Sequence, residues 1–169
     1  MKISTKGRYA LRLLLDLAIN ETDEYIPIKS IAGRQEISGK YLEQIINQLN
    51  KAGFVVSTRG SQGGYKLARH PSEYTVGAIL RTMEGNLKFS SCLDEGHSCD
   101  RASTCITQGV WKKMQNAVDE VIDNITLENL VDDYYEKAEL ADFESPFDKS
   151  ICADPACAEP TTTKRDGAI

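Results

Sequence analysis

Three short helical patterns followed by a glycine-tipped pair of strands occupy the first seventy residues, and this order is compatible with few folds. Apolar residues recur at helical spacing in each helical segment, as in Leu11, Leu14 and Leu15, so each helix presents one face to a core. The expected helices cover residues 4–20, 27–35 and 38–52, and the expected strands cover 54–58 and 65–68. Glycines at 60, 63 and 64 suit the turn between the strands, because glycine tolerates positive φ. We therefore expect a mainly α domain with one small β-hairpin.

The rest of the chain adds helices and a tail. A fourth helix is expected between the capping residue Thr75 and Gly85, a long helix from about Cys105 to Asn124, and a short helix after Thr126. Residues beyond 137 are acidic and proline-containing, which is typical of disorder. The expected organisation is a helix-turn-helix domain (1–85), a cysteine-rich loop (86–104), a pair of helices (105–137) and a tail (138–169).

Three helices and a β-hairpin in this order predict a winged helix-turn-helix domain. Such a domain places its third helix in the major groove of DNA, where the first residues of the helix reach base edges and phosphates. The hairpin tip can enter a minor groove. The residues expected to contact DNA are Ser38, Lys40, Tyr41, Glu43 and Gln44 on the third helix and Arg59 and Ser61 on the hairpin. Ser38, Lys40 and Tyr41 are expected on phosphates, Gln44 on adenine and Glu43 on cytosine.

Charge is divided unevenly along the chain. Residues 1–70 carry 11 Lys and Arg against 6 Asp and Glu, whereas residues 71–169 carry 9 against 19. A basic first half within a chain of net charge −5 indicates a local surface for a polyanion. The alternatives are an uneven distribution of solvated charge, or a winged helix that serves protein contacts.

Five cysteines without an export signal argue against a disulfide framework. The sequence also has no apolar run long enough to cross a membrane, so we expect a cytoplasmic protein. Cys92, Cys99 and Cys105 are spaced too widely for a zinc site built on Cys-x-x-Cys. Three soft thiolates in a loop suit an iron–sulfur cluster or a labile metal, and the alternative is three reduced, redox-reactive thiols.

Three stretches resemble those of a known family. They are the opening Met1–Ala10, the third-helix motif Tyr41–Gln44 and the hairpin Arg59–Tyr65. Together they are similar to the iron–sulfur cluster regulator family of bacterial winged-helix transcription factors, over about residues 1–135. The similarity is greatest to its cluster-biosynthesis regulator branch.

The resemblance implies a homodimer that binds a near-palindromic operator in double-stranded DNA. The long helix would pair with its counterpart through an apolar stripe. The members of this stripe are Val110, Met114, Ala117, Val118, Val121, Ile122 and Ile125. The resemblance also implies that Cys92, Cys99 and Cys105 hold an iron–sulfur cluster, with 2Fe–2S preferred over 4Fe–4S.

The sequence departs from the family at the fourth cluster ligand. Gln108 stands where one branch has histidine, and Arg8 stands where another takes an acidic ligand. His97, a tail cysteine (Cys152 or Cys157), solvent or a small thiol are the substitutes to consider.

Two other functions remain open. One is a thiol-redox or zinc-responsive regulator without iron. The other is a module that binds a protein partner, such as a cysteine-metabolism regulator. An enzyme is not expected, because no nucleophile elbow, phosphate loop or carboxylate pair is present.

Overall fold

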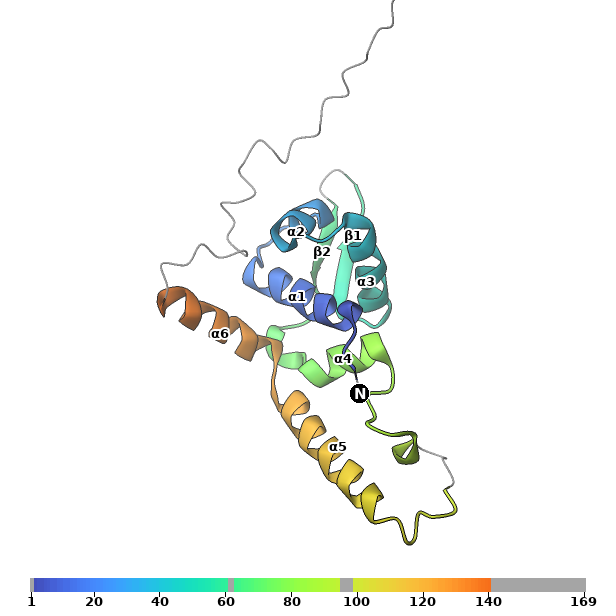
Figure 1. Cartoon of the computed structure of the whole chain (residues 1–169). Coiled ribbons are helices and arrows are strands. Elements are labelled where there is room, and N and C mark those ends of the chain that lie inside the picture. The colour runs from blue at the N-terminus through green and yellow to red at the C-terminus, as the bar shows by residue number, and fades with distance from the viewer. Residues whose placement is uncertain (1, 61–62, 95–98, 141–169) are drawn as a thin grey trace, which may run out of the picture.

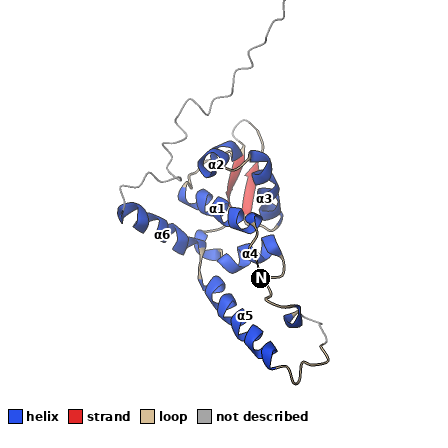
Figure 2. Ribbon diagram, in the orientation of Figure 1, coloured by secondary structure: helices blue, strands red, loops and turns tan. Residues whose placement is uncertain are grey.

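The computed structural model describes residues 2–60, 63–94 and 99–140. Its elements, in chain order, are α1 (Thr5–Ile19), α2 (Ile28–Gln35), α3 (Gly39–Lys51), β1 (Val55–Thr58), β2 (Gly64–Leu67), the 3₁₀ turn η1 (Pro71–Glu73), α4 (Val76–Glu84), the 3₁₀ turn η2 (Ser91–Leu93), α5 (Ile106–Asn124) and α6 (Leu127–Leu140). The mainly helical class with one antiparallel hairpin is confirmed (Figures 1 and 2). None of the described helices is long and apolar enough to cross a membrane.

Side-chain caps fix the start of three helices where the sequence predicts them. The Ser4 hydroxyl accepts hydrogen bonds from the first turn of α1, Ser38 accepts one from the N–H of Tyr41 in α3, and Thr75 accepts one from Ala78 in α4. Each cap supplies an acceptor to an N–H group that has no partner within its helix, which stabilises a helix by about 1 kcal/mol. These caps place the N-terminus of α3 at a defined position on the domain surface.

The main core lies where α1 packs against α2, α3, α4, α6 and β2. The fully buried apolar residues come from every one of the first three helices. They include Leu13, Leu14, Ile31, Leu42, Ile45, Ile46 and Leu49, all at 0% exposure. The four apolar residues of α3 all face inward, so its polar residues are left on the outside, as the helical periodicity predicts.

A buried ion pair joins α1 to α2, and here the structure departs from expectation. The periodicity of α1 places Asp16 on a polar face with Arg12, but the Asp16 side chain is fully buried. The Arg34 guanidinium donates two parallel hydrogen bonds of 2.8 Å to the Asp16 carboxylate, and the Gln35 side chain donates a third at 3.3 Å. Arg12 in turn donates to the Gln35 side chain at 2.9 Å. A carboxylate so buried requires such partners.

The hairpin pairs Val55 with Leu67 and Thr58 with Gly64. Gly60 in its turn has a φ of 115°, which side-chain-bearing residues rarely adopt. At Gly64, an added Cβ would overlap the backbone of Ile26, because Ile26 pairs with Tyr65 in an isolated bridge. Glycine at 64 therefore lets the hairpin join the chain that enters α2.

Helix α5 extends away from the domain, and the 86–105 segment runs to its N-terminal end (Figure 1). At its C-terminal end, the Val76 N–H donates to Ile125 O at 2.9 Å and the Leu127 N–H donates to Tyr74 O at 2.8 Å. These bonds fix the junction between α5 and α6 to the start of α4. Helix α6 then returns against α1 and runs to Leu140, so it is longer than the short helix expected and passes residue 137. The tail from 141 onward lies outside the described residues.

Candidate functional site

The outer face of α3 carries the polar residues that were predicted to meet DNA. Lys40, Glu43 and Gln44 are exposed, and so is the capping residue Ser38. Tyr41 is half-buried, with its ring in edge contact with that of Tyr9 at 5.9 Å between centroids. An exposed face of this composition on a helix of 13 residues can donate to and accept from base edges in a major groove.

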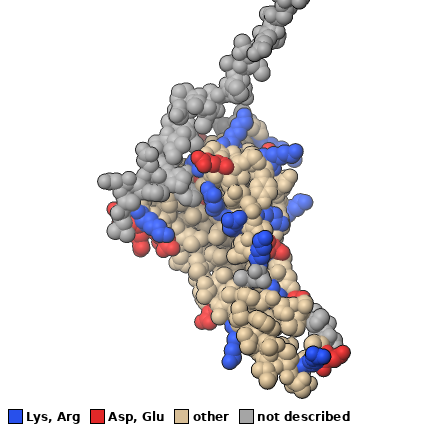
Figure 3. Space-filling view, in the orientation of Figure 1, with Lys and Arg blue, Asp and Glu red and all other residues tan. Residues whose placement is uncertain are grey.

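The hairpin carries the second predicted contact. Arg59 follows β1 directly and is exposed, and Ser61 lies outside the described residues. Lys and Arg side chains outnumber Asp and Glu on the visible face of the α1–α3 region, with a few acidic side chains among them (Figure 3). The arrangement offers a local basic surface beside the exposed face of α3.

The three central cysteines lie on separate short features of the 86–105 segment. Cys92 lies in η2, Cys99 begins the turn before α5, and Cys105 is the N-cap residue of α5. All three are free and half-buried. The Cys92 sulfur lies 2.9 Å from the Ser90 hydroxyl. Within residues 2–60, 63–94 and 99–140, no three His, Cys, Asp or Glu side chains are assembled close enough to hold one metal ion.

Cys105 lies among hydrogen-bond donors that favour its thiolate form. Its sulfur lies 3.2 Å from the Thr107 hydroxyl. Hydrogen bonds from that hydroxyl and from the Gln108 N–H lower the pKa of the Cys105 thiol. A thiolate at a helix N-terminus is a stronger nucleophile and metal ligand than a thiol. The donor chemistry of the three cysteines therefore fits a soft metal centre, although the described residues do not assemble them around one.

Gln108 faces the same segment. Its side-chain nitrogen donates to Cys92 O at 3.4 Å, and both residues line a cavity of about 340 Å³ between the segment and α5. The other positions considered for the fourth ligand are placed elsewhere. Arg8 is exposed and hydrogen-bonds to Thr5, while His97, Cys152 and Cys157 lie outside the described residues.

Helix α5 exposes most of its predicted apolar stripe. Val110, Met114 and Val121 are 49%, 41% and 56% exposed, and Ile106, outside the predicted stripe, is 89% exposed. Trp111, which the stripe did not include, adds a further apolar surface at 37% exposure. Only the C-terminal end of the stripe, at Ile122 and Ile125, packs on the α4 region. The helix thus has an apolar face that none of the other described residues covers.

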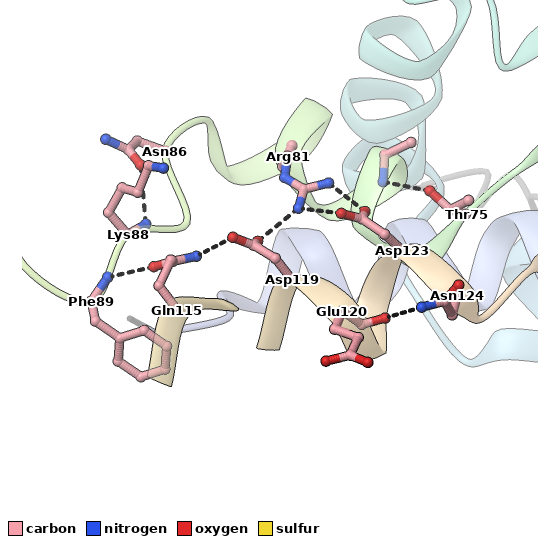
Figure 4. Close-up of polar contacts among 11 residues, drawn as sticks. Thr75, Arg81, Asn86, Lys88, Phe89, Gln115, Asp119, Glu120, Asp123 and Asn124 are labelled. Carbon is pink, nitrogen blue, oxygen red and sulfur yellow. Dashed lines mark hydrogen bonds and ion pairs between the residues drawn. The ribbon is translucent and has the colours of Figure 1, made fainter. Parts of the chain in front are cut away.

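A group of polar contacts that the sequence did not reveal joins α5 to α4 and to the cysteine segment (Figure 4). Arg81 of α4 donates to Asp123 at 2.6 and 2.9 Å and to Asp119 at 2.7 Å. Gln115, one turn before Asp119, donates to its carboxylate at 3.0 Å and accepts from the Phe89 N–H at 3.1 Å. We call Arg81, Gln115, Asp119 and Asp123 the clasp.

Burial and hydrogen bonding shift the pKa values of two residues of the clasp, Arg81 and Asp119. Gln115 is the single buried residue of α5, at 5% exposure. Hydrogen bonds to Asp123 and Asp119 raise the pKa of Arg81, which stays a cation. Partial burial acts to raise the pKa of Asp119, but hydrogen bonds from Gln115 and Arg81 outweigh it, so the pKa lies below its ordinary value.

Comparison with known proteins places the fold and the motifs in one family. Residues 3–133 match the Rrf2 family model, described as an iron-dependent transcriptional regulator. The protein rrf2 of Nitratidesulfovibrio vulgaris is 38% identical over 133 residues, which is 79% of this chain and 89% of that protein. The HTH-type transcriptional regulator IscR of Vibrio campbellii is 34% identical over 133 residues, or 79% of each chain.

Solved structures give the same assignment. The T. potens IscR structure matches with a TM-score of 0.66 and 42% identity over 85% of this chain and 94% of that one. CymR, the global cysteine regulator of B. subtilis, matches with a TM-score of 0.65 and 38% identity over 78% of this chain and 97% of that one.

Proposed function

Because the chain belongs to the Rrf2 family and is a DNA-binding transcriptional regulator, we propose that it binds its operator as a homodimer whose affinity depends on an iron–sulfur cluster held by Cys92, Cys99 and Cys105. A regulator of this kind acts where the chromosome lies, which supports a cytoplasmic location. The relatives named as transcriptional regulators are not enzymes, and the proposal includes no catalytic step.

The observation that carries the proposal is the exposed polar face of α3 above a completely apolar inner face. Gln44 is exposed at the position from which an amide can pair with adenine, and Lys40 at a position suited to phosphate.

The experiment first selects an operator, as the duplex that the protein binds from a random pool. Gln44→Ala should weaken binding by about tenfold or more and relax the preference at one base. Lys40→Ala should weaken binding equally for all sequences and reduce the dependence of affinity on salt.

The salt dependence separates DNA binding from the protein-interaction alternative. A dimer that neutralises several phosphates should lose affinity steeply as salt rises. Arg59→Ala should reduce that slope as well as the affinity. A flat dependence on salt, with no sequence selected from the pool, would favour a module that binds a protein partner.

The dimer is supported by the exposed face of α5. Val110, Trp111, Met114 and Val121 form an apolar surface on one projecting helix, and a monomer would leave this surface in water. A second copy of the same helix, related by a two-fold axis, offers the same surface in return. Pairing at α5 would also set the distance between two copies of α3, and an operator with two half-sites requires such a fixed distance.

The cluster is supported by donor chemistry and by relatives. Three cysteines with one lowered thiol pKa are suited to iron, and the matched family is described as iron-dependent. When bound, the cluster would supply a redox- and iron-sensitive centre that orders the segment between α4 and α5.

Purification without oxygen should give a coloured protein containing iron and sulfide in equal amounts. Cys92→Ser, Cys99→Ser and Cys105→Ser should each lose that colour, whereas a tail variant, Cys157→Ser, should keep it unless the tail supplies the fourth ligand.

A thiol-responsive regulator is the second candidate, and the lowered pKa of Cys105 favours it. The similarity to a cysteine regulator, CymR, extends over the same part of the chain. In this case the protein would be colourless without oxygen, and oxidation of Cys105 would change operator affinity. Native mass spectrometry separates the two candidates, because an iron–sulfur cluster and a zinc ion add different masses and a disulfide removes the mass of two hydrogen atoms.

A further inference from the structure

The clasp joins the cysteine segment to α4, and α4 packs against α1 and α3 of the DNA-binding domain. The Phe89 N–H, three residues before Cys92, donates to Gln115, and Gln115 donates to Asp119. Asp119 and Asp123 together hold Arg81 of α4. Every link is at most 3.1 Å long.

Helix α4 carries the connection onward to α3 and α1. The Gln48 side chain of α3 donates to the carbonyl of Thr82, the residue after Arg81, at 2.7 Å. Glu84, at the end of α4, accepts from the Ser4 hydroxyl at 2.7 Å and from the Gly7 N–H at 3.1 Å. A rotation of α4 would therefore move α3, which carries the proposed DNA surface, and α1.

The clasp also fixes the angle between α5 and α4. Its contacts lie beyond the junction that holds the C-terminal end of α5. Backbone bonds at Val76 and Leu127 fix only the C-terminal end of α5 to α4. Asp123 and Asp119 contact α4 farther back along the helix, and Gln115 contacts the segment one turn beyond them. A packed glycine, Gly77, makes room for this arrangement, because an added Cβ there would overlap the Asp123 carboxylate and lie 2.7 Å from Arg81 Nη1.

We propose that Arg81, Gln115 and Asp119 are positioning residues that transmit the state of the cysteine segment to the operator-binding surface. The inference rests on the proposed function and specifies how its site is regulated. When the segment is ordered, the Phe89 N–H holds Gln115, which keeps Asp119 aligned with Arg81 and fixes the angle between α5 and α4. When the segment is disordered, Gln115 loses one partner and the angle is fixed less tightly. In a dimer joined at α5, that angle sets how far apart the two copies of α3 lie.

The test compares Asp119→Asn with Glu120→Gln. Both substitutions remove one negative charge from α5, but Glu120 is exposed and the hydrogen bond it accepts uses its backbone carbonyl. Each protein is prepared with and without its cluster, and two quantities are measured: operator affinity in both states, and hydrogen exchange of residues 86–94 in the cluster-bound state. Gly77→Ala is the second variant, because it displaces Asp123 while replacing glycine by a better helix former.

We expect wild type and Glu120→Gln to show an affinity ratio between the two states of roughly 5- to 150-fold, the usual range for coupled sites. Asp119→Asn and Gly77→Ala should retain iron content and thermal stability, lower that ratio to about threefold or less, and exchange faster at 86–94. A wild-type ratio retained by both variants would overturn the proposal while leaving cluster-dependent regulation intact. A ratio of one in wild type would overturn both this inference and the proposed function.

Discussion

The α1–β2 region and helix α5 differ in how much of their apolar surface the chain buries. In the first region each helix contributes apolar side chains at 0% exposure, and the polar face of α3 is in solvent. In α5 the buried residue is the amide Gln115, whereas Ile106, Val121 and Val110 are 89%, 56% and 49% exposed. The first region therefore buries its apolar core among the described residues. The apolar face of α5 is left exposed.

This difference indicates what each region is for. A region with its own core can present a rigid polar face to DNA, because the core fixes the positions of the exposed side chains. The exposed apolar face of α5 supports the proposed dimer, and its buried residue, Gln115, accepts a hydrogen bond from the cysteine segment. Stability of the first region should therefore depend on its interior, and assembly should depend on α5.

Arg34→Leu should have the largest effect on stability. It leaves the Asp16 carboxylate, which is fully buried, without its charged partner, and we expect a loss of about 3–5 kcal/mol in the free energy of unfolding. Urea denaturation of the metal-free protein measures this loss. The double variant Asp16→Leu, Arg34→Leu should recover much of it, and a single variant as stable as wild type would show that the α1–α2 core does not depend on the pair.

Val121→Glu should separate assembly from folding. A charge within the exposed stripe of α5 should convert the dimer to monomer, as measured by sedimentation velocity, and weaken operator binding by about a hundredfold because one half-site is lost. The unfolding temperature of the α1–α4 core should change little. The matched control is Val56→Glu, since Val56 is also an exposed apolar residue, at 41%, but lies on β1. A dimer that survives Val121→Glu or dissociates with Val56→Glu would place the interface elsewhere.

Thr107→Val should slow the alkylation of Cys105 in the metal-free protein. The Thr107 hydroxyl is the main cause of the lowered pKa of Cys105, so its removal raises that pKa and reduces the thiolate fraction at neutral pH. Mass spectrometry after brief iodoacetamide treatment should show a rate lower by a factor of a few at Cys105 and unchanged at Cys92. Equal rates in wild type and Thr107→Val would mean that the hydroxyl does not stabilise the thiolate.

Glu36→Asn should have the smallest effect, and it acts on the turn between α2 and α3. Glu36 ends α2 in the left-handed conformation with φ 54°, which asparagine tolerates better than glutamate. We expect a gain of roughly 0.5 kcal/mol or less in unfolding free energy, with operator affinity unchanged. A loss of stability would indicate that the exposed Glu36 side chain makes a contact worth more than the backbone strain.

The helices, hairpin and recognition face could be predicted from the sequence because their signals are local. Ser4, Ser38 and Thr75 are capping residues, and the stripe of Leu42, Ile45, Ile46 and Leu49 follows the helical period. The same local reasoning placed Asp16 on a polar face. It failed there because the partner, Arg34, comes from another helix 18 residues away, and only the packing of α1 on α2 buries both.

The clasp could not be predicted for the same reason. Asp119 and Asp123 are four residues apart and share one face of α5, but their partner Arg81 is about forty residues earlier in the chain. Gln115 occupies a position beside the apolar stripe, and nothing in its sequence context shows that it is buried. The cysteine ligands remain a prediction, since their grouping depends on a segment that includes residues 95–98, which lie outside the described residues.

The most direct test of the account is the affinity of one operator duplex for the same protein with and without its iron–sulfur cluster, measured without oxygen at fixed salt. We predict a coloured protein whose affinity for that duplex changes by at least fivefold when the iron is removed, with the dimer intact in both states. A colourless preparation without iron that binds the duplex at full affinity would contradict the account.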